Sequence, residues 1–66
     1  MKVVVMKNGA YLANVVKTDY GTEYKYTNNR NNALIFNAMG VAKDIASRQD
    51  GAEAVMLCKI KEEKNG

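Results

Sequence analysis

The sequence predicts an α+β fold, in which a small, mainly antiparallel sheet carries one helix packed on a face and the element order is βββαβ. Two observations lead to this class. The first half of the chain reads as short strands around an Asn-Gly dipeptide, which is typical of tight hairpins. The second half has apolar residues at helical spacing and then a final apolar run. With 66 residues the chain is expected to form a single domain, 1–66, with a marginal core.

Residues 3–16 predict a β-hairpin that turns at Asn8 and Gly9. These two residue types tolerate the positive φ angles of a type I′ turn. With both in the turn, Met6 is expected opposite Tyr11, and side chains alternate between the two faces of the sheet. One face then carries Val3, Val5, Leu12 and Val16, and the other carries Val4, Met6, Tyr11, Ala13 and Val15.

A second turn near Asp19 and Gly21 leads into a strand over residues 23–27. Tyr24 and Tyr26 fall on one side of this strand, and the charged residues on its other side suit the edge of a sheet. The asparagine-rich stretch 27–32 is interpreted as a chain reversal, because asparagine side chains bond to nearby backbone amides. The alternative is a specific contact surface around Arg30.

Residues 33–36 suit either a short buried strand or the start of a helix. Asn37 is the expected N-cap of an amphipathic helix over residues 38–50, and Gly51 the left-handed residue that closes it. The apolar run that follows, up to Cys58, predicts a closing strand beside the first strand. Cys58 is expected to be a buried packing residue, and the charges from Lys61 to Lys64 follow the strand.

Composition argues against catalysis and against a bound cofactor. The chain has no histidine that could bind zinc or act as the base that activates its single cysteine. No catalytic residue, metal site or cofactor is therefore predicted. Asp44, Asp50 and Glu53 could form an acid and base set, but solvated charges near a helix end explain them equally well. The apolar runs are shorter than the roughly 20 residues of a membrane span, so we expect a cytoplasmic protein without membrane contact.

The strongest surface signal is a set of tyrosines near basic residues. The candidate interaction surface consists of Tyr20, Tyr24, Lys25, Tyr26 and Arg30. Its tyrosines could cover the sheet beside the helix, contact another protein, or stack nucleic-acid bases. The net charge of +3 is dispersed along the chain, which favours solubility over a nucleic-acid footprint.

The segment ALIFNAMGVAKDIASRQDGAEAVMLCKI, residues 33–60, resembles small uncharacterised phage and prophage proteins of Gram-positive bacteria. In those proteins an Ala and a Phe precede a short Ala-rich helix, a glycine and a closing strand. The matching positions here are Ala33, Phe36, Ala42, Ala46, Gly51, Val55 and Ile60. The resemblance implies a compact β-rich fold without an attached activity, and small phage proteins often act by binding a host protein.

We therefore expect a non-catalytic protein-interaction module of phage type that binds and modulates a host protein. A first alternative is a small nucleic-acid-binding protein that uses Tyr24, Tyr26, Lys25 and Arg30. A second is a structural homodimer without an external ligand. Self-association is expected in any case, because a single short helix covers one face of a sheet whose two faces are both apolar. The predicted dimer contact is the uncovered face or the edge of the closing strand.

Overall fold

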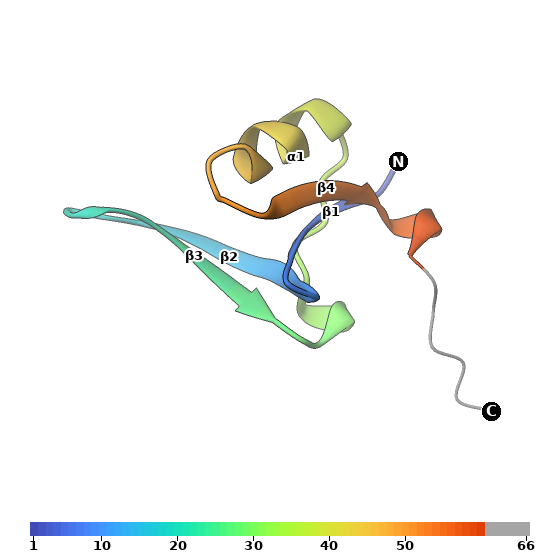
Figure 1. Ribbon diagram of the computed structural model, residues 1–66, viewed down its shortest axis with the longest axis horizontal. Coiled ribbons are helices and arrows are strands. Elements are labelled where there is room, and N and C mark those ends of the chain that lie inside the picture. Colours follow the sequence, from blue (N-terminus) through green and yellow to red (C-terminus); the bar gives the residue numbers. More distant parts are fainter. Residues whose placement is uncertain (61–66) are drawn as a thin grey trace.

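The computed structural model describes residues 1–60 and shows a four-stranded antiparallel sheet with one α-helix (Figure 1). The α+β class is confirmed, and the order βββαβ agrees in outline. The strand order β3-β2-β1-β4 places the closing strand beside the first, as expected. The elements are β1 (Val3–Lys7), β2 (Ala10–Thr18), β3 (Gly21–Thr27), the 3-10 helix η1 (Arg30–Asn32), α1 (Met39–Ala46), β4 (Ala52–Met56) and the 3-10 helix η2 (Leu57–Lys59).

The β1–β2 hairpin turns where the sequence predicts. Asn8 has a φ of 53° and Gly9 a φ of 82°, the left-handed values that a type I′ turn needs at both central positions. Met6 lies opposite Tyr11, which confirms the predicted register next to the turn. The β1–β2 ladder is short, however, and extends no further than this pair.

Beyond Tyr11, β2 pairs with β3, and its register shifts between Leu12 and Asn14. Ala13 is the extra residue of this β-bulge, and an extra residue reverses the alternation of the side chains that follow. Val15 therefore packs on the same core as Leu12. Val16 pairs with Glu23 on the opposite face. The predicted faces were wrong for Val15 and Val16 because they assumed an uninterrupted strand.

Where β2 leaves β1, a third segment lies between them. The Leu34 amide donates to the Leu12 carbonyl at 2.9 Å, and Phe36 exchanges two backbone hydrogen bonds with Val3, at 2.7 and 2.9 Å. Of the two interpretations of residues 33–36, the extended one is confirmed. The segment satisfies backbone groups that the short β1–β2 ladder leaves without a partner.

The asparagine-rich stretch is a chain reversal, as predicted. Asn29 caps η1, and its side-chain oxygen accepts a hydrogen bond from the Asn31 amide at 2.9 Å. The Asn29 amide in turn donates to Thr27 Oγ1 at 3.0 Å. These local bonds explain why asparagine is concentrated here.

The helix α1 is shorter than predicted at both ends. It begins after Ala38, whose side chain makes no capping bond, and it stops at Ala46. Ser47 Oγ donates to the Asp44 carbonyl at 2.6 Å, and Gln49 Nε2 to the Ile45 carbonyl at 3.1 Å. Side chains thus satisfy carbonyls at the helix end, and the chain turns. Gly51 has the expected left-handed φ, 81°, but it lies in the turn before β4 rather than at the helix end.

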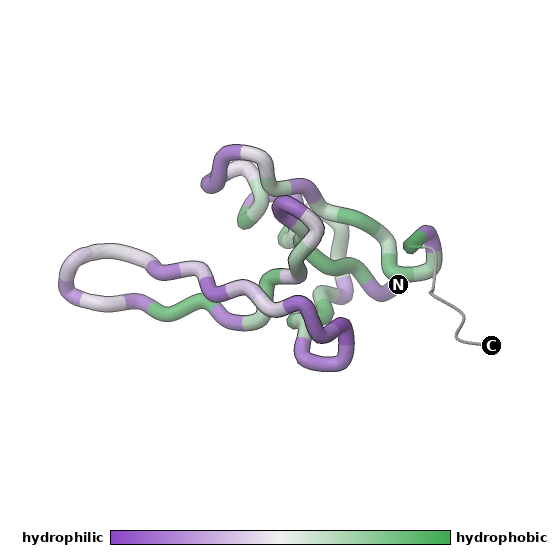
Figure 2. Tube along the Cα trace, turned by 60° about the horizontal axis from the view of Figure 1, so that its bottom comes forward, coloured by the Kyte–Doolittle hydropathy of each residue, from purple (hydrophilic) through white to green (hydrophobic). Residues whose placement is uncertain are grey.

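The core lies between α1 and one face of the sheet. Its fully or nearly fully buried members are Val3, Val5, Leu12, Ala42 and Ala46. The two alanines present small side chains to the sheet, so the helix can approach it closely. Figure 2 shows most of the strongly hydrophobic residues in the body of the molecule and residues of intermediate to low hydropathy at the far end of the β2–β3 hairpin.

The face of the sheet without a helix is not bare. Val4 is fully buried although it does not belong to the cluster under α1. Within residues 1–60, the large apolar side chains that are well exposed lie on different elements: Met1, Tyr20, Ile35 and Val41. The expectation of a wide uncovered apolar face is therefore wrong. No helix in the described part of the chain is long and apolar enough to span a membrane.

The closing strand ends earlier than predicted. β4 stops at Met56, and Cys58 lies exposed in η2. The prediction of a buried Cys58 was wrong, because the apolar run continues past the strand into a 3-10 turn. The charges from Lys61 to Lys64 lie outside the described residues.

Candidate functional site

The sequence-predicted surface is divided among several parts of the fold. Tyr20 lies at the tip of the β2–β3 hairpin and is 100% exposed. This hairpin extends away from the helix and the other strands (Figure 1). Tyr24 and Tyr26 are half-buried and pack against the core. Lys25 alternates with them along β3 and is exposed on the other face.

Arg30 lies apart from the tyrosines, in η1. Its Nη2 donates to the Leu57 carbonyl at 3.3 Å and so links η1 to η2. Of the five residues, the structure brings Tyr24 and Tyr26 together and separates Tyr20, Lys25 and Arg30 from them. Their role in binding stays a prediction.

The tyrosine pair has a structural role at the helix side of the sheet. The Tyr26 hydroxyl donates to Gln49 Oε1, in the turn after α1. Burial raises the pKa of Tyr26 above its usual 10.0, and the neighbouring Tyr24 raises it further. The protonated phenol is the form that can donate to Gln49, so the hydrogen bond and the pKa shift are consistent.

Tyr26→Phe is expected to make the fold less sensitive to alkali. A group whose pKa is raised by folding contributes stability that is full below its unfolded pKa of about 10 and is lost as the pH rises through the folded value. Urea midpoints at about pH 8 and about pH 11 should therefore differ more for the original chain than for the variant. Tyr20→Phe, at the exposed tip, is the control. An equal alkaline loss in both variants would contradict the role of Tyr26.

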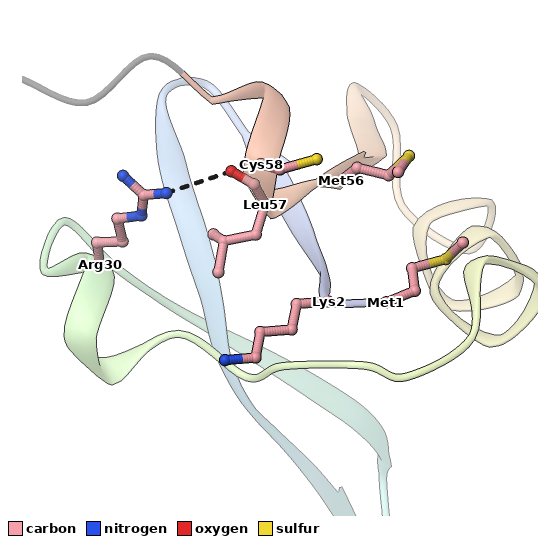
Figure 3. A pocket seen from close by; sticks show the side chains of 6 residues that line it. All are labelled: Met1, Lys2, Arg30, Met56, Leu57 and Cys58. Atoms are coloured by element: carbon pink, nitrogen blue, oxygen red, sulfur yellow. Dashed lines mark hydrogen bonds between the residues drawn. The ribbon is translucent and has the colours of Figure 1, made fainter.

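A different group of residues forms a cleft at one end of the sheet. Its volume is about 430 Å³. Figure 3 shows the chain before β1 on one side, the end of β4 with η2 on the other, and Arg30 reaching in from η1. The Leu57 amide donates to the Lys2 carbonyl at 2.8 Å and ties the first two of these segments together. The lining residues are Met1, Lys2, Arg30, Met56, Leu57 and Cys58.

The cleft combines apolar walls with positive charge. Two methionines and a leucine provide flexible apolar surface, while Lys2 and Arg30 provide cations, and none of the lining residues among 1–60 is a carboxylate. Such a site suits an apolar group next to an anion. The exposed Cys58 thiol lies at its wall. Among residues 1–60, no three histidine, cysteine or carboxylate side chains come together in a way that could hold a metal ion.

Sequence reasoning missed this cleft because three segments far apart in the chain form it. The early end of β4, which turns Leu57 and Cys58 into η2, also has no clear marker in the sequence. The sequence features that could have indicated the cleft are the apolar residues Leu57 and Cys58 after β4 and the basic residue Lys2 before β1.

A second, smaller hollow of about 240 Å³ lies between the β2–β3 hairpin and α1. Tyr24 and Ile45 line it, and Asp44 pairs with Arg48 at 3.0 Å nearby, with both side chains more than half exposed. Asp44 therefore forms an exposed ion pair one turn apart on the helix surface, which is a common arrangement in helices. The hollow is more polar than the cleft, and its cations, Lys17 and Arg48, stand beside the carboxylate of Asp44.

Comparisons of the chain with protein-family models, with curated proteins and with solved structures found no match.

Proposed function

We propose that the chain is a non-catalytic protein-interaction module whose binding site is the cleft lined by Met1, Lys2, Arg30, Met56, Leu57 and Cys58. The observation that carries the proposal is a cleft that, within residues 1–60, combines apolar walls of Met1, Met56 and Leu57 with the cation of Lys2. The matching ligand is an apolar side chain of another protein that stands beside an acidic residue.

The volume of the cleft and the side chains that line it suit a peptide ligand. Ligand sites in proteins commonly enclose about 300–1,000 Å³, and the cleft lies at the small end of that range. Methionine side chains adapt to differently shaped apolar partners. The cations supply orientation, because a carboxylate beside the apolar group is attracted to one side of the cleft.

The kind of partner rests on the resemblance to phage and prophage proteins. On that basis the ligand is a host protein that the module modulates. The exposed Tyr20 at the hairpin tip is a secondary contact for such a partner, since tyrosine is enriched in protein interfaces.

The nucleic-acid alternative receives less support from the geometry. A stacking platform needs aromatic faces open to bases and cations beside them. Tyr24 and Tyr26 pack against the core, and Lys25 lies on the opposite face of β3.

Site-directed cross-linking tests the cleft. Cys58 is the single cysteine of the chain, so a maleimide with a photoreactive group attaches at the cleft wall without further substitution. In lysate of the source organism or its host, irradiation should give a discrete protein adduct that excess unlabelled chain suppresses. Lys2→Glu should weaken the adduct at least several-fold, because it places a negative charge beside an acidic ligand.

The matched control is Lys25→Glu, which changes the net charge by the same amount outside the cleft. If Lys25→Glu abolishes the adduct and Lys2→Glu does not, the sequence-predicted surface is the binding site and the cleft is not. An adduct that disappears after nuclease treatment would favour the nucleic-acid alternative. Equal adducts from Cys58 and from a label at Ser47→Cys in a Cys58→Ser background would show that capture is unspecific.

A further inference from the structure

The turn between β1 and β2 carries a dipeptide with a chemistry of its own. Asn8 and Gly9 are both exposed, and among residues 1–60 Asn8 is the only asparagine that precedes a glycine. In such a pair the glycine nitrogen can attack the asparagine side-chain carbonyl, because glycine has no side chain to shield its amide. Apart from its chain neighbours, no atom lies within 4 Å of the position that a Cβ would take on Gly9. The surroundings therefore leave room for this attack.

The reaction needs only water as a second reactant. The Gly9 nitrogen forms a bond to Cγ of Asn8, and ammonia leaves, which closes a cyclic succinimide. Water then opens the ring at one of its two carbonyls. Cleavage between the nitrogen and Cγ gives aspartate. Cleavage between the nitrogen and the main-chain carbonyl gives isoaspartate, in which the main chain runs through the side chain and is longer by one carbon atom.

The folded turn holds the reacting groups apart. Asn8 and Gly9 have φ angles of 53° and 82°, as a type I′ turn requires. As the mirror image of type I, this turn gives its first central residue a ψ of about +30°. At that angle the Gly9 nitrogen lies nearly opposite Cβ of Asn8 across the Cα–C bond, whereas ring closure needs the two on the same side. The reaction must therefore wait until the turn opens.

The strands beside the turn are joined by few bonds. The β1–β2 seam consists of two residue pairs, Lys7 with Ala10 and Met6 with Tyr11. Local opening is favoured where few bonds must break. On its other side β1 pairs with all five residues of β4, and these pairs do not involve the turn. The seam can therefore open at the turn while β1 stays bound to β4.

We propose that Asn8 is a modification site gated by the turn, and that its conversion to isoaspartate keeps the β1–β2 seam open. A type I′ turn joins two strands through two residues of left-handed backbone, and a main chain lengthened at the first of them loses that geometry. Ring closure occurs only from the open seam, and the isoaspartate product cannot restore the closed one. The modification thus turns a transient opening into a permanent change.

The rate of reaction tests the gating. The chain is incubated at mildly alkaline pH, once folded and once in concentrated guanidinium chloride. Peptide mapping by mass spectrometry assigns the product to Asn8, which is necessary because Asn65 also precedes a glycine. The reaction at Asn8 should be at least about tenfold slower in the folded chain, since it proceeds only from the open population. Equal rates would overturn the gating, and no product at Asn8 in denaturant would overturn the site.

Two synthetic chains test the effect on the seam. One has isoaspartate in place of Asn8, and the other is Asn8→Asp. They have the same atoms and charge and differ only in the path of the main chain, and Asp-Gly also suits a type I′ turn. The Ala10 amide, which closes the turn, should exchange with solvent at least about tenfold faster in the isoaspartate chain. The amides of Glu53 and Val55, which face β1, should stay protected in both chains.

The site and the cleft are tested separately, because Asn8 follows β1 and Lys2 precedes it. The rates at Asn8 and Ala10 report on the turn, and capture at Cys58 reports on the cleft. Equal protection of Ala10 in the two synthetic chains would overturn the release of the seam. Loss of protection at Glu53 and Val55 in the isoaspartate chain would also overturn it, since the change would then unfold the sheet as a whole.

Discussion

Leu12→Ala is expected to unfold a large part of the protein at room temperature. Among residues 1–60, Leu12 is the largest fully buried side chain, and it lies in the cluster under α1. Truncation of a buried leucine costs about 2–5 kcal/mol. Small domains have a total stability near the low end of about 5–15 kcal/mol. Thermal and urea unfolding followed by circular dichroism should show a strongly lowered midpoint or no folded baseline.

Val16→Ala is the informative comparison for this variant. An uninterrupted strand would place Val16 on the buried face with Leu12, whereas the bulge at Ala13 turns it to the opposite face, beside Glu23. Val16 is only partly buried, so its truncation should cost less than about 1 kcal/mol. Comparable losses in the two variants would show that the bulge is absent in solution.

Phe36→Ala is expected to have the second largest effect, about 2–3 kcal/mol, because the ring packs against the core from a segment that also pairs with Val3. Loss of the ring loosens residues 34–36 between β1 and β2. The Val3 amide, which donates to Phe36, should then exchange with solvent faster. Urea unfolding measures the first effect and amide hydrogen exchange the second.

Ile35→Ala is the matched control for Phe36→Ala. Ile35 is the preceding residue in the same extended segment, but its side chain is 44% exposed. Its truncation should change the free energy of unfolding by less than about 0.5 kcal/mol. A larger loss at Ile35 than at Phe36 would mean that the segment is turned over relative to the structure described here.

The features that follow from neighbouring residues could be predicted from the sequence. Asn8 and Gly9 define the first turn by their own φ preferences, and Asn29 defines the reversal at η1 by bonds within a few residues. The closing strand could be placed beside the first because its apolar composition needs cover. Each of these inferences depends on local chemistry or on simple burial.

Other features depend on contacts that no local pattern marks. Ala13 has no property that distinguishes a bulge from a regular strand position, yet it decides which of Val15 and Val16 is in the core. The helix end depends on side-chain bonds from Ser47 and Gln49 that compete with further turns. The cleft needs Lys2, Arg30 and Leu57 to meet, and their proximity arises only from the complete fold.

The short β1–β2 ladder has a consequence for motion. Only two residue pairs join these strands directly, whereas β2 and β3 pair almost to the hairpin tip and β1 pairs with β4 along its whole length. The part of the hairpin near its tip, beyond the core-packed Val15 and Tyr24, therefore projects from a base formed by the strands under the helix. Local opening is cheapest where few bonds must break. The tip of the hairpin can therefore change position or open locally while β1, β4 and α1 remain packed together. Tyr20 moves with the tip and can reach partners over a wider range than a side chain fixed on the core.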